Sequence, residues 1–264
     1  MKNRKAVYTI ITLLIATGFY FYDGYAVETG VSNRTENSDD FDYLPTSTTG
    51  QIIHHQFYSL SYNEKYEQAE WVAYELTQKQ LSSIPIKRPY FKKDPKVRTQ
   101  SAHYKNFKDS GDNKGHLCPA GDRKFSLEAY NETFFTSNIS PQTYEFNGGV
   151  WNRLEEKVRY WAQKIEKLYI VTGGILSPNL KTIGSEKVAV PQYFYKIILD
   201  YDGAETKAIA FLVPHEKSEK GLYQFVVSID EIETLTGIDF FPELPDKIEN
   251  EIEKSGNYKH WAFR

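Results

Sequence analysis

The stretch that decides how this 264-residue chain folds begins with Gly111-Asp112-Asn113-Lys114-Gly115-His116-Leu117-Cys118-Pro119-Ala120-Gly121-Asp122. It continues through Ser137-Asn138-Ile139-Ser140-Pro141-Gln142 to Asn147-Gly148-Gly149-Val150-Trp151-Asn152-Arg153-Leu154-Glu155. In these three blocks, polar side chains that can bind metals or move protons lie among glycines and prolines, which form turns. Such a composition is typical of a functional site rather than of a hydrophobic core.

The third block predicts a helix. Asn147, Trp151 and Glu155 are spaced four residues apart, so a helix would place them on one face, about two turns from end to end. A neighbouring apolar stripe indicates that the helix packs against a core. The residues of that stripe are Leu154, Val158 and Trp161.

The chain around His116 is predicted to be extended or looped, because Gly115 precedes it and Pro119 follows it closely. A hairpin that carries a histidine beside a helix that carries an amide and a carboxylate could form a hydrolytic site. The imidazole would deprotonate water, and the oxygen ligands would hold a hard cation such as Mg²⁺.

These blocks, in this order, resemble the DNA/RNA non-specific endonucleases (ββα-metal or His-Me finger nucleases), whose metal site is built around an Asp-Arg-Gly-His motif. The resemblance includes Asn131-Glu132-Thr133-Phe134-Phe135 and extends from about residue 50 to the C-terminus. It implies an α+β fold with antiparallel sheets flanked by helices and a ββα-metal motif at the active site. The implied activity is hydrolysis of phosphodiester bonds in DNA and RNA with little sequence preference.

The resemblance also implies a role for each candidate site residue. His116 is at the position of the general base, and Asn147 at that of the only direct protein ligand of the catalytic Mg²⁺, for which Mn²⁺ or another divalent cation is an alternative. Glu155 is at the position of the acid that anchors metal-bound water, and Asn138 at that of an asparagine that supports the site. Arg88 is at the position of an arginine that stabilises the pentacovalent phosphate.

The chain departs from the family motif at two positions. Asn113 and Lys114 stand where the family usually has Asp and Arg before Gly-His. Lys114 keeps the positive charge near phosphate but lacks the planar two-pronged donor of arginine. Asn113 lacks a carboxylate, for which neighbouring Asp112 is a candidate replacement. We expect these changes to affect rate and preference rather than the type of reaction.

Two alternative functions follow from the departures and from the charge. The net charge of −3 gives no overall attraction to nucleic acid, although basic residues cluster between Lys87 and Arg98 and could form a local positive rim. One alternative is a membrane-tethered, non-catalytic nucleic-acid-binding module with a degenerate site. The other is a hydrolase of a small phosphodiester.

The N-terminus predicts export. Lys2, Arg4 and Lys5 precede an uncharged, largely apolar run from Ala6 to Tyr22, the form of a signal peptide. The run is also close to the minimum length of a membrane-spanning helix. Residues 1–26 are therefore predicted to be a signal peptide or a membrane anchor, with the protein periplasmic, secreted or held at a membrane through residues 6–22.

The rest of the chain predicts one large domain. Residues 27–50 are rich in polar residues and are expected to form a disordered linker, and residues 51–264 the nuclease domain. Strands are expected near 69–76, 168–171, 193–201, 207–213 and 224–227, with a hairpin turn at Asp202-Gly203. Ser228 and Glu231 predict the start of a helix that ends at Gly237.

Four other histidines and the single cysteine are given structural roles. His54 and His55 are expected to be strand residues with one ring outward and one inward, while His215 and His260 are expected at the surface. Cys118 is the only cysteine, so no intramolecular disulfide can form, and it is interpreted as a small buried residue.

Overall fold

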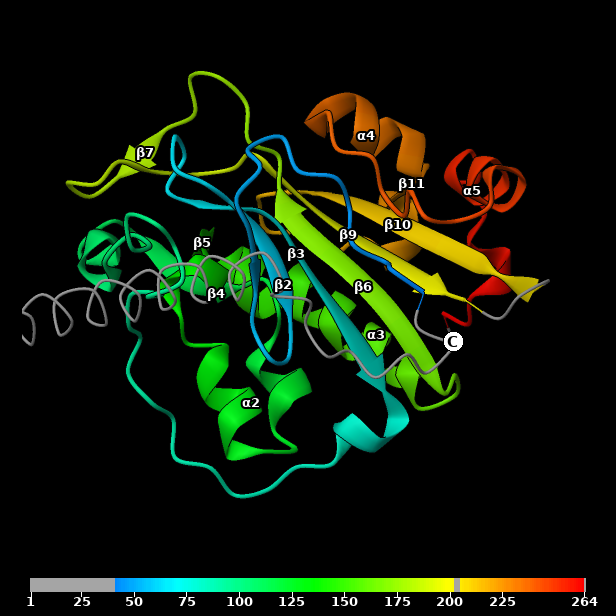
Figure 1. Cartoon of the computed structure of the whole chain (residues 1–264), viewed down its shortest axis with the longest axis horizontal. Helices are drawn as coiled ribbons and strands as arrows, with labels where there is room; N and C mark the ends of the chain where they lie inside the picture. Colours follow the sequence, from blue (N-terminus) through cyan, green and yellow to red (C-terminus); the bar gives the residue numbers. More distant parts are fainter. Residues whose placement is uncertain (1–40, 202–204, 264) are drawn as a thin grey trace, which may run out of the picture. The chain divides into compact units, whose positions relative to one another are not determined.

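An antiparallel sheet is the central element of the domain (Figure 1). The computed structural model describes residues 41–201 and 205–263, and within them seven strands form this sheet in the order β1-β2-β3-β6-β9-β10-β11. Two further antiparallel pairs, β4-β5 and β7-β8, lie outside it. The strands are β1 (Ile52–His54), β2 (Ser59–Asn63), β3 (Gln68–Thr77), β4 (Asp112–His116), β5 (Ile139–Thr143), β6 (Lys167–Gly174), β7 (Thr182–Ile183), β8 (Val188–Ala189), β9 (Tyr193–Asp200), β10 (Lys207–Pro214) and β11 (Val226–Val227).

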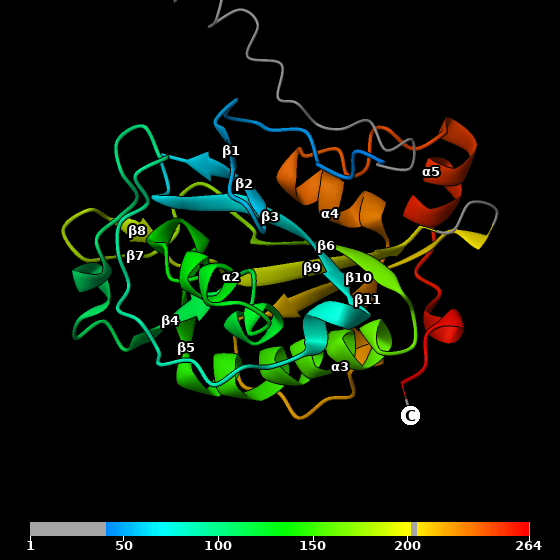
Figure 2. The ribbon, with the colours of Figure 1, turned by 60° about the horizontal axis from the view of Figure 1, so that its bottom comes forward.

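Helices lie on both faces of the sheet, so its central strands are buried on both sides. Figure 2 shows α3 on one face and α4 on the other. Strand β9 accordingly has seven successive buried residues after Tyr193. The helices are α2 (Leu127–Glu132), α3 (Asn152–Ala162), α4 (Ile229–Thr236) and α5 (Asp246–Glu253), with a π-helical turn η5 (Phe146–Trp151) and the short 3-10 turns η1 (Gln78–Leu81), η2 (Tyr104–Phe107), η3 (Ala120–Arg123), η4 (Thr136–Asn138), η7 (Leu222–Phe225) and η8 (Tyr258–His260).

The predicted apolar stripe of α3 forms part of the core beneath the sheet. Leu154, Val158 and Trp161 are each at most 2% exposed, and they belong to one cluster with Phe194 and Phe211 of the sheet. Burying such side chains contributes roughly 1.5–3 kcal/mol each. This packing holds α3 against β9 and β10, and therefore fixes the position of every polar side chain that α3 carries.

Residues 42–50 differ from the predicted disordered linker. The folded unit begins at Asp42 rather than at residue 51. The Thr46 N–H donates to the Asp239 carbonyl, and the Asp239 N–H donates to the Thr46 hydroxyl. The Thr46 carbonyl accepts a hydrogen bond from the indole of buried Trp71 at 2.8 Å. This segment satisfies polar groups on two neighbouring elements, which explains why a polar composition does not prevent it from packing.

The predicted α+β class, with antiparallel strands and flanking helices, is confirmed. Strands β9 and β10 pair from Lys207 opposite Asp200 to Pro214 opposite Tyr193, as predicted, while the predicted turn at Asp202-Gly203 lies outside the described residues. The strand predicted at 224–227 is shorter, because η7 occupies its first half. Helix α4 is capped by Ser228 and ends at Gly237 in the left-handed conformation, as predicted.

Candidate active site

Strands β4 and β5, followed by η5 and α3, form a ββα unit beside the large sheet (Figures 1 and 2). The two strands are antiparallel, with His116 opposite Ile139 and Lys114 opposite Pro141. The chain then passes through the π turn, which is kinked at Gly149, and enters α3. This connectivity places the predicted base on a strand and the predicted metal-binding residues on the adjoining helix.

His116 ends β4 in an aromatic environment. Its ring lies 5.6 Å from the Phe91 ring and 5.1 Å from the Phe134 ring, and its Nε2 atom has no hydrogen-bond partner among the described residues. Burial, together with the neighbouring Arg88 guanidinium, lowers the pKa of His116 to about 3. The imidazole is therefore neutral at neutral pH and has the free nitrogen that a general base requires.

Gly115 is required by packing across the β4–β5 pair. A Cβ atom at this position would lie 2.1 Å from the side-chain oxygen of Gln142, which is itself fully buried. Because side chains alternate along a strand, Lys114 and His116 are on the same face and Gly115 is on the other. The glycine before the histidine thus allows close contact with β5 and leaves the functional face free.

Arg88 approaches the site from an extended segment without regular secondary structure. Its guanidinium carbon lies 5.6 Å from the centre of the Phe91 ring and 5.5 Å from that of Phe134, the same two rings that contact His116. Cation–π contacts at these distances orient a guanidinium while leaving its N–H donors available. Arg88 and His116 are brought together in this way, although they are 28 positions apart in the sequence.

Lys114 makes similar contacts. Its Nζ atom lies 5.7 Å from the centre of the Phe91 ring and 5.6 Å from that of Phe107. The basic segment upstream is only partly free, since Lys93 pairs with Glu186 at 2.9 Å and Lys96 donates to the His54 carbonyl. Arg88 is the cation whose charge acts on His116, and Lys114 contacts Phe91, one of the rings beside the imidazole.

Asn138 holds the chain that follows His116. Its Oδ1 accepts from the Cys118 backbone N–H at 2.8 Å, and its Nδ2 donates to the carbonyls of Cys118 and Thr133, each at 3.0 Å. In addition, the N–H of Leu117 donates to the backbone carbonyl of Asn138. The side chain is fully buried, so Asn138 positions the histidine strand and does not face a substrate.

Asn147 lies in the π turn rather than in a regular α-helix, which corrects the predicted spacing. The N–H of Asn152 donates to the Asn147 carbonyl, five residues earlier, and Gly149 has the non-helical angles φ −103° and ψ −111°. Trp151 is fully buried, whereas Asn147 and Glu155 are half-buried, and the π turn interrupts the regular helical spacing between Asn147 and Trp151. Single π turns of this kind are frequent at functional sites.

Glu155 lies in the first turn of α3, where burial and neighbouring charges shift its pKa. Burial raises the pKa of Glu155 to about 7, and the Lys196 ammonium acts in the opposite direction. Burial also lowers the pKa of Lys196, whose Nζ has no hydrogen-bond partner among the described residues and lies 4.9 Å from the Trp151 ring centre. Sequence reasoning missed Lys196, because a lysine in an apolar strand gives no sign of facing inward.

An ion pair connects α3 to the loop after His116. Arg159 of α3 donates to Asp122 at 2.8 Å, and Asp122 also accepts a hydrogen bond from the Tyr74 hydroxyl at 3.1 Å. Asp122 is only 1% exposed, and so is neighbouring Arg123, which donates to the carbonyls of Phe57 and Glu75. The strand and the helix of the ββα unit are thereby fixed relative to one another.

His215 was predicted to be a surface residue, but it is half-buried and holds the end of β5. Its Nε2 accepts from the Thr143 N–H at 2.8 Å, and its Nδ1 donates to the Pro191 carbonyl at 2.8 Å. Its ring also packs edge-on against Phe146 and Phe194. Burial lowers the pKa of His215, and this outweighs the hydrogen bond to Pro191.

The other histidine and cysteine interpretations agree with the structure. His54 is exposed, whereas His55 is buried and pairs with Asp94 at 2.8 Å, so neither belongs to a metal cluster with the site residues. His260 is exposed. Cys118 is fully buried, and burial raises its pKa to about 12, which leaves it protonated and unreactive.

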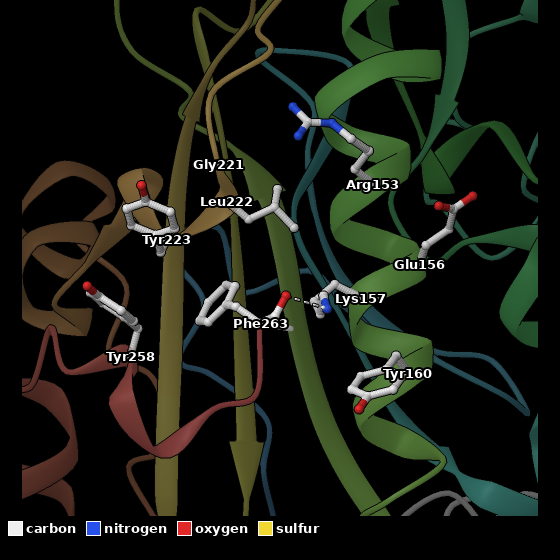
Figure 3. A pocket seen from close by; sticks show the side chains of 9 residues that line it. All are labelled: Arg153, Glu156, Lys157, Tyr160, Gly221, Leu222, Tyr223, Tyr258 and Phe263. Atoms are coloured by element: carbon white, nitrogen blue, oxygen red, sulfur yellow. Dashed lines mark hydrogen bonds between the residues drawn. The ribbon is translucent and has the colours of Figure 1, made fainter.

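A cavity on a different face of α3 does not contain the candidate site. It has a volume of about 820 Å³ and lies between α3 and the C-terminal segment (Figure 3). None of the predicted site residues lines it. The lining residues are Arg153, Glu156, Lys157, Tyr160, Gly221, Leu222, Tyr223, Tyr258 and Phe263.

The fold and the ββα unit define a nuclease of the ββα class. The comparison with protein families agrees: the model of the DNA/RNA non-specific endonuclease family matches residues 40–247. This chain belongs to that family.

Individual proteins that are similar to this chain are named as nucleases. The chain is 36% identical to zebrafish "Nuclease EXOG, mitochondrial" over 70% of its own length and 59% of that protein. It is 31% identical to "Nuclease C1" of Cunninghamella echinulata over 75% of this chain and 85% of that protein. The alignment spans less than two thirds of the zebrafish relative. A solved structure of an EndoG/EndoGI complex matches with a TM-score of 0.70 and 26% identity, covering 75% of this chain and 88% of that chain.

These relatives overturn the predicted location. Proteins from zebrafish, mouse and human that are 35–36% identical to this chain are named as mitochondrial nucleases, so the prediction of an exported, periplasmic, secreted or membrane-anchored protein is wrong. Residues 1–26, on which that prediction was based, lie outside the described residues. Among the residues that the structure describes, no helix has the length and apolarity to cross a membrane.

Proposed function

We propose that this chain is a divalent-metal-dependent endonuclease that hydrolyses phosphodiester bonds in both DNA and RNA with little sequence preference. Membership of the DNA/RNA non-specific endonuclease family supports the substrate class. The observation that carries the proposal is the state of His116: a neutral imidazole with an unpartnered Nε2 at the end of β4, beside the guanidinium of Arg88. A neutral base next to a cation is suited to activating water against an anionic phosphate.

In this proposal His116 takes a proton from water as the water oxygen attacks phosphorus. The P–O bond to the leaving oxygen then breaks, and that oxygen is protonated from solvent. Arg88 stabilises the extra negative charge of the pentacovalent phosphate, and Lys114 contributes a second positive charge from the same face of β4 as His116. Asn138 is a positioning residue, because its hydrogen bonds are to backbone groups of Cys118 and Thr133.

The side chains of η5 and α3 fit a hard divalent cation. Asn147 offers a neutral amide oxygen and Glu155 a carboxylate, the donor types that Mg²⁺ and Mn²⁺ accept in such sites. Burial raises the pKa of Glu155, which indicates a carboxylate with too little compensating positive charge. Asn147 would bind the cation directly, and Glu155 would hold water in its coordination shell. When bound, the cation would polarise a phosphate oxygen and stabilise the leaving oxygen.

The test is cleavage of supercoiled plasmid and of a structured RNA by the full chain, with Mg²⁺ and with chelator. His116→Ala is compared with His260→Ala, which removes an exposed histidine elsewhere. We expect Mg²⁺-dependent cutting of both polymers, reduced at least ~100-fold in His116→Ala and unchanged in His260→Ala.

Each of the other outcomes has a definite meaning. Binding of nucleic acid without cutting, across several divalent metals, would favour a non-catalytic module. Hydrolysis of small diesters but not of polymers would favour a small-substrate hydrolase. Near-parental cutting by His116→Ala would show that His116 is not the base.

A further inference from the structure

Carboxylates gather between α4 and α5, on helices that carry none of the proposed active-site residues. Asp230 and Glu233 are three residues apart on α4, and Glu249 and Glu253 are four apart on α5, so each pair lies on one side of its helix. Asp239 follows the left-handed glycine that ends α4. Figure 1 shows α4 and α5 as neighbours next to β10, away from the β4–β5 pair.

Glu253 is the centre of this group of five acids. Its oxygens form two sets of close carboxylates, one with Asp230 and Glu233 and one with Asp239 and Glu249, and within each set the ligand atoms lie within 4.8 Å of one another. Ca²⁺ binds oxygen at 2.3–2.6 Å, so two ligands on opposite sides of one ion are about 4.6–5.2 Å apart. The oxygens of either set are therefore close enough together to be ligands of a single cation.

Glu253 is also a buried acceptor without a donor. Only 9% of the residue is exposed, and its Oε1 atom is buried with no hydrogen-bond partner among the described residues. A buried carboxylate oxygen that lacks a partner costs several kcal/mol unless it is neutralised or bound. This carboxyl group must therefore be neutralised either by a proton or by a bound cation.

No ion pair among the described residues neutralises these carboxylates. Burial and the neighbouring carboxylates raise the pKa of Glu253 to about 8, and burial also raises the pKa values of Glu233 and Glu249. The last turn of α5, where Glu253 lies, carries partial negative charge from free carbonyls and adds to the field that attracts a cation.

We propose that the acids between α4 and α5 form a second divalent-cation site, separate from the ββα unit, in which Glu253 is the central ligand. The cation is of the Ca²⁺ type. Three carboxylates in either set are more than Mg²⁺ usually takes from protein, whereas Ca²⁺ accepts six to eight oxygens in flexible geometry. Binding would join α4 to α5 and to the chain around Asp239, so its effect is on stability rather than on the chemical step.

The experiment is calorimetric titration of CaCl₂ into the chelator-treated full chain, with thermal unfolding measured at the same Ca²⁺ concentrations. Both are done on the Asn147→Ala protein, which removes the proposed active-site ligand, and on the same protein with Glu253→Gln added. Glu251→Gln, which changes an exposed acid of the same helix, is the matched control. Asp239→Asn, at an exposed position, replaces Glu253→Gln if that variant does not fold.

We expect Ca²⁺ binding by the Asn147→Ala protein and a rise in Tm of roughly 5–10 °C at Ca²⁺ one hundred times the Kd. Glu253→Gln should lose most of this rise, and Glu251→Gln should retain it. Absence of binding in the Asn147→Ala protein would overturn the proposal and show that the acids are neutralised by protons. An equal Tm rise with and without Glu253 would also overturn it. Neither result would bear on the proposed nuclease activity, which is measured separately.

Discussion

The side-chain amide of Asn138 bonds the backbone of Cys118 on both sides, with Oδ1 accepting from its N–H at 2.8 Å and Nδ2 donating to its carbonyl at 3.0 Å. The direction of the chain two residues beyond His116 therefore depends on one amide. Because this clamp is fully buried, water cannot replace it.

Asn138→Ala should weaken both stability and catalysis. The change leaves buried backbone groups of Cys118 and Thr133 without partners, which costs at least about 2 kcal/mol. Displacement of His116 should lower kcat by roughly 10- to 100-fold with little change in KM, measured well below the Tm of the variant. Asn250→Ala, which removes an exposed amide from α5, should change neither quantity by much. A fully active Asn138→Ala enzyme would show that the hydrogen bonds of Asn138 do not determine the position of His116.

Lys114 should act on the phosphate backbone through its charge. Lys114→Met should reduce the slope of log kcat/KM against log salt concentration by about 1, because one fewer phosphate is neutralised. Lys114→Arg should keep the slope and increase kcat/KM, since a guanidinium can form two parallel hydrogen bonds to phosphate. Lys254→Met, at an exposed position just after α5, serves as the control. An unchanged slope in Lys114→Met would show that Lys114 does not neutralise a phosphate of the substrate.

Arg88 should influence both the transition state and the protonation of His116. Arg88→Met should lower kcat by about 100-fold, the usual effect of losing a donor to a developing anion. The pKa of His116 is lowered to about 3 by burial and by Arg88, so removing the guanidinium should raise it. NMR titration of the His116 ring can measure this shift directly. A pKa that stays the same in Arg88→Met would mean that the two side chains are not neighbours in solution.

Stability should depend on pH through His215. Its pKa in the folded protein is lowered, so the unfolded chain, with a pKa near 6.5, takes up the proton first as the pH falls. The stabilisation from the neutral ring is fully present above about pH 6.5 and is lost as the pH falls toward the folded-state pKa. Protonation would also place an N–H of the ring against the Thr143 N–H.

The measurement is Tm against pH for the parent and for His215→Gln, whose amide keeps one donor and one acceptor. The advantage of the parent over the variant should shrink between about pH 7.5 and 5.5. His260→Gln, at an exposed position, should follow the parent throughout. A constant difference between the parent and His215→Gln would contradict the proposed linkage.

Local signals allowed much of the fold to be predicted. Strands β9 and β10 lie on either side of a turn sequence, and α4 is marked by Ser228 and Gly237, so each could be recognised within a few residues. The π turn could not be recognised from the sequence, because the spacing of four residues between Asn147 and Trp151 is also that of an ordinary α-helix. His215 was missed because its partner Thr143 is 72 residues away. Lys196 was missed because hydropathy alone does not reveal a charge that faces inward from a strand.

Because the chain forms a π turn at Gly148-Gly149, the number of residues in this turn determines how Asn147 is oriented relative to α3. A π turn holds one residue more than an α turn, and each residue of an α-helix rotates the chain by about 100°. No atom lies within 4 Å of a Cβ built on Gly148, so a small side chain has room there, whereas the backbone angles of Gly149 disfavour any residue with a side chain. Removing one residue would instead turn Asn147 by about a quarter of a circle relative to Glu155. A substitution at Gly148 should therefore be tolerated more readily than the deletion of a residue from this segment.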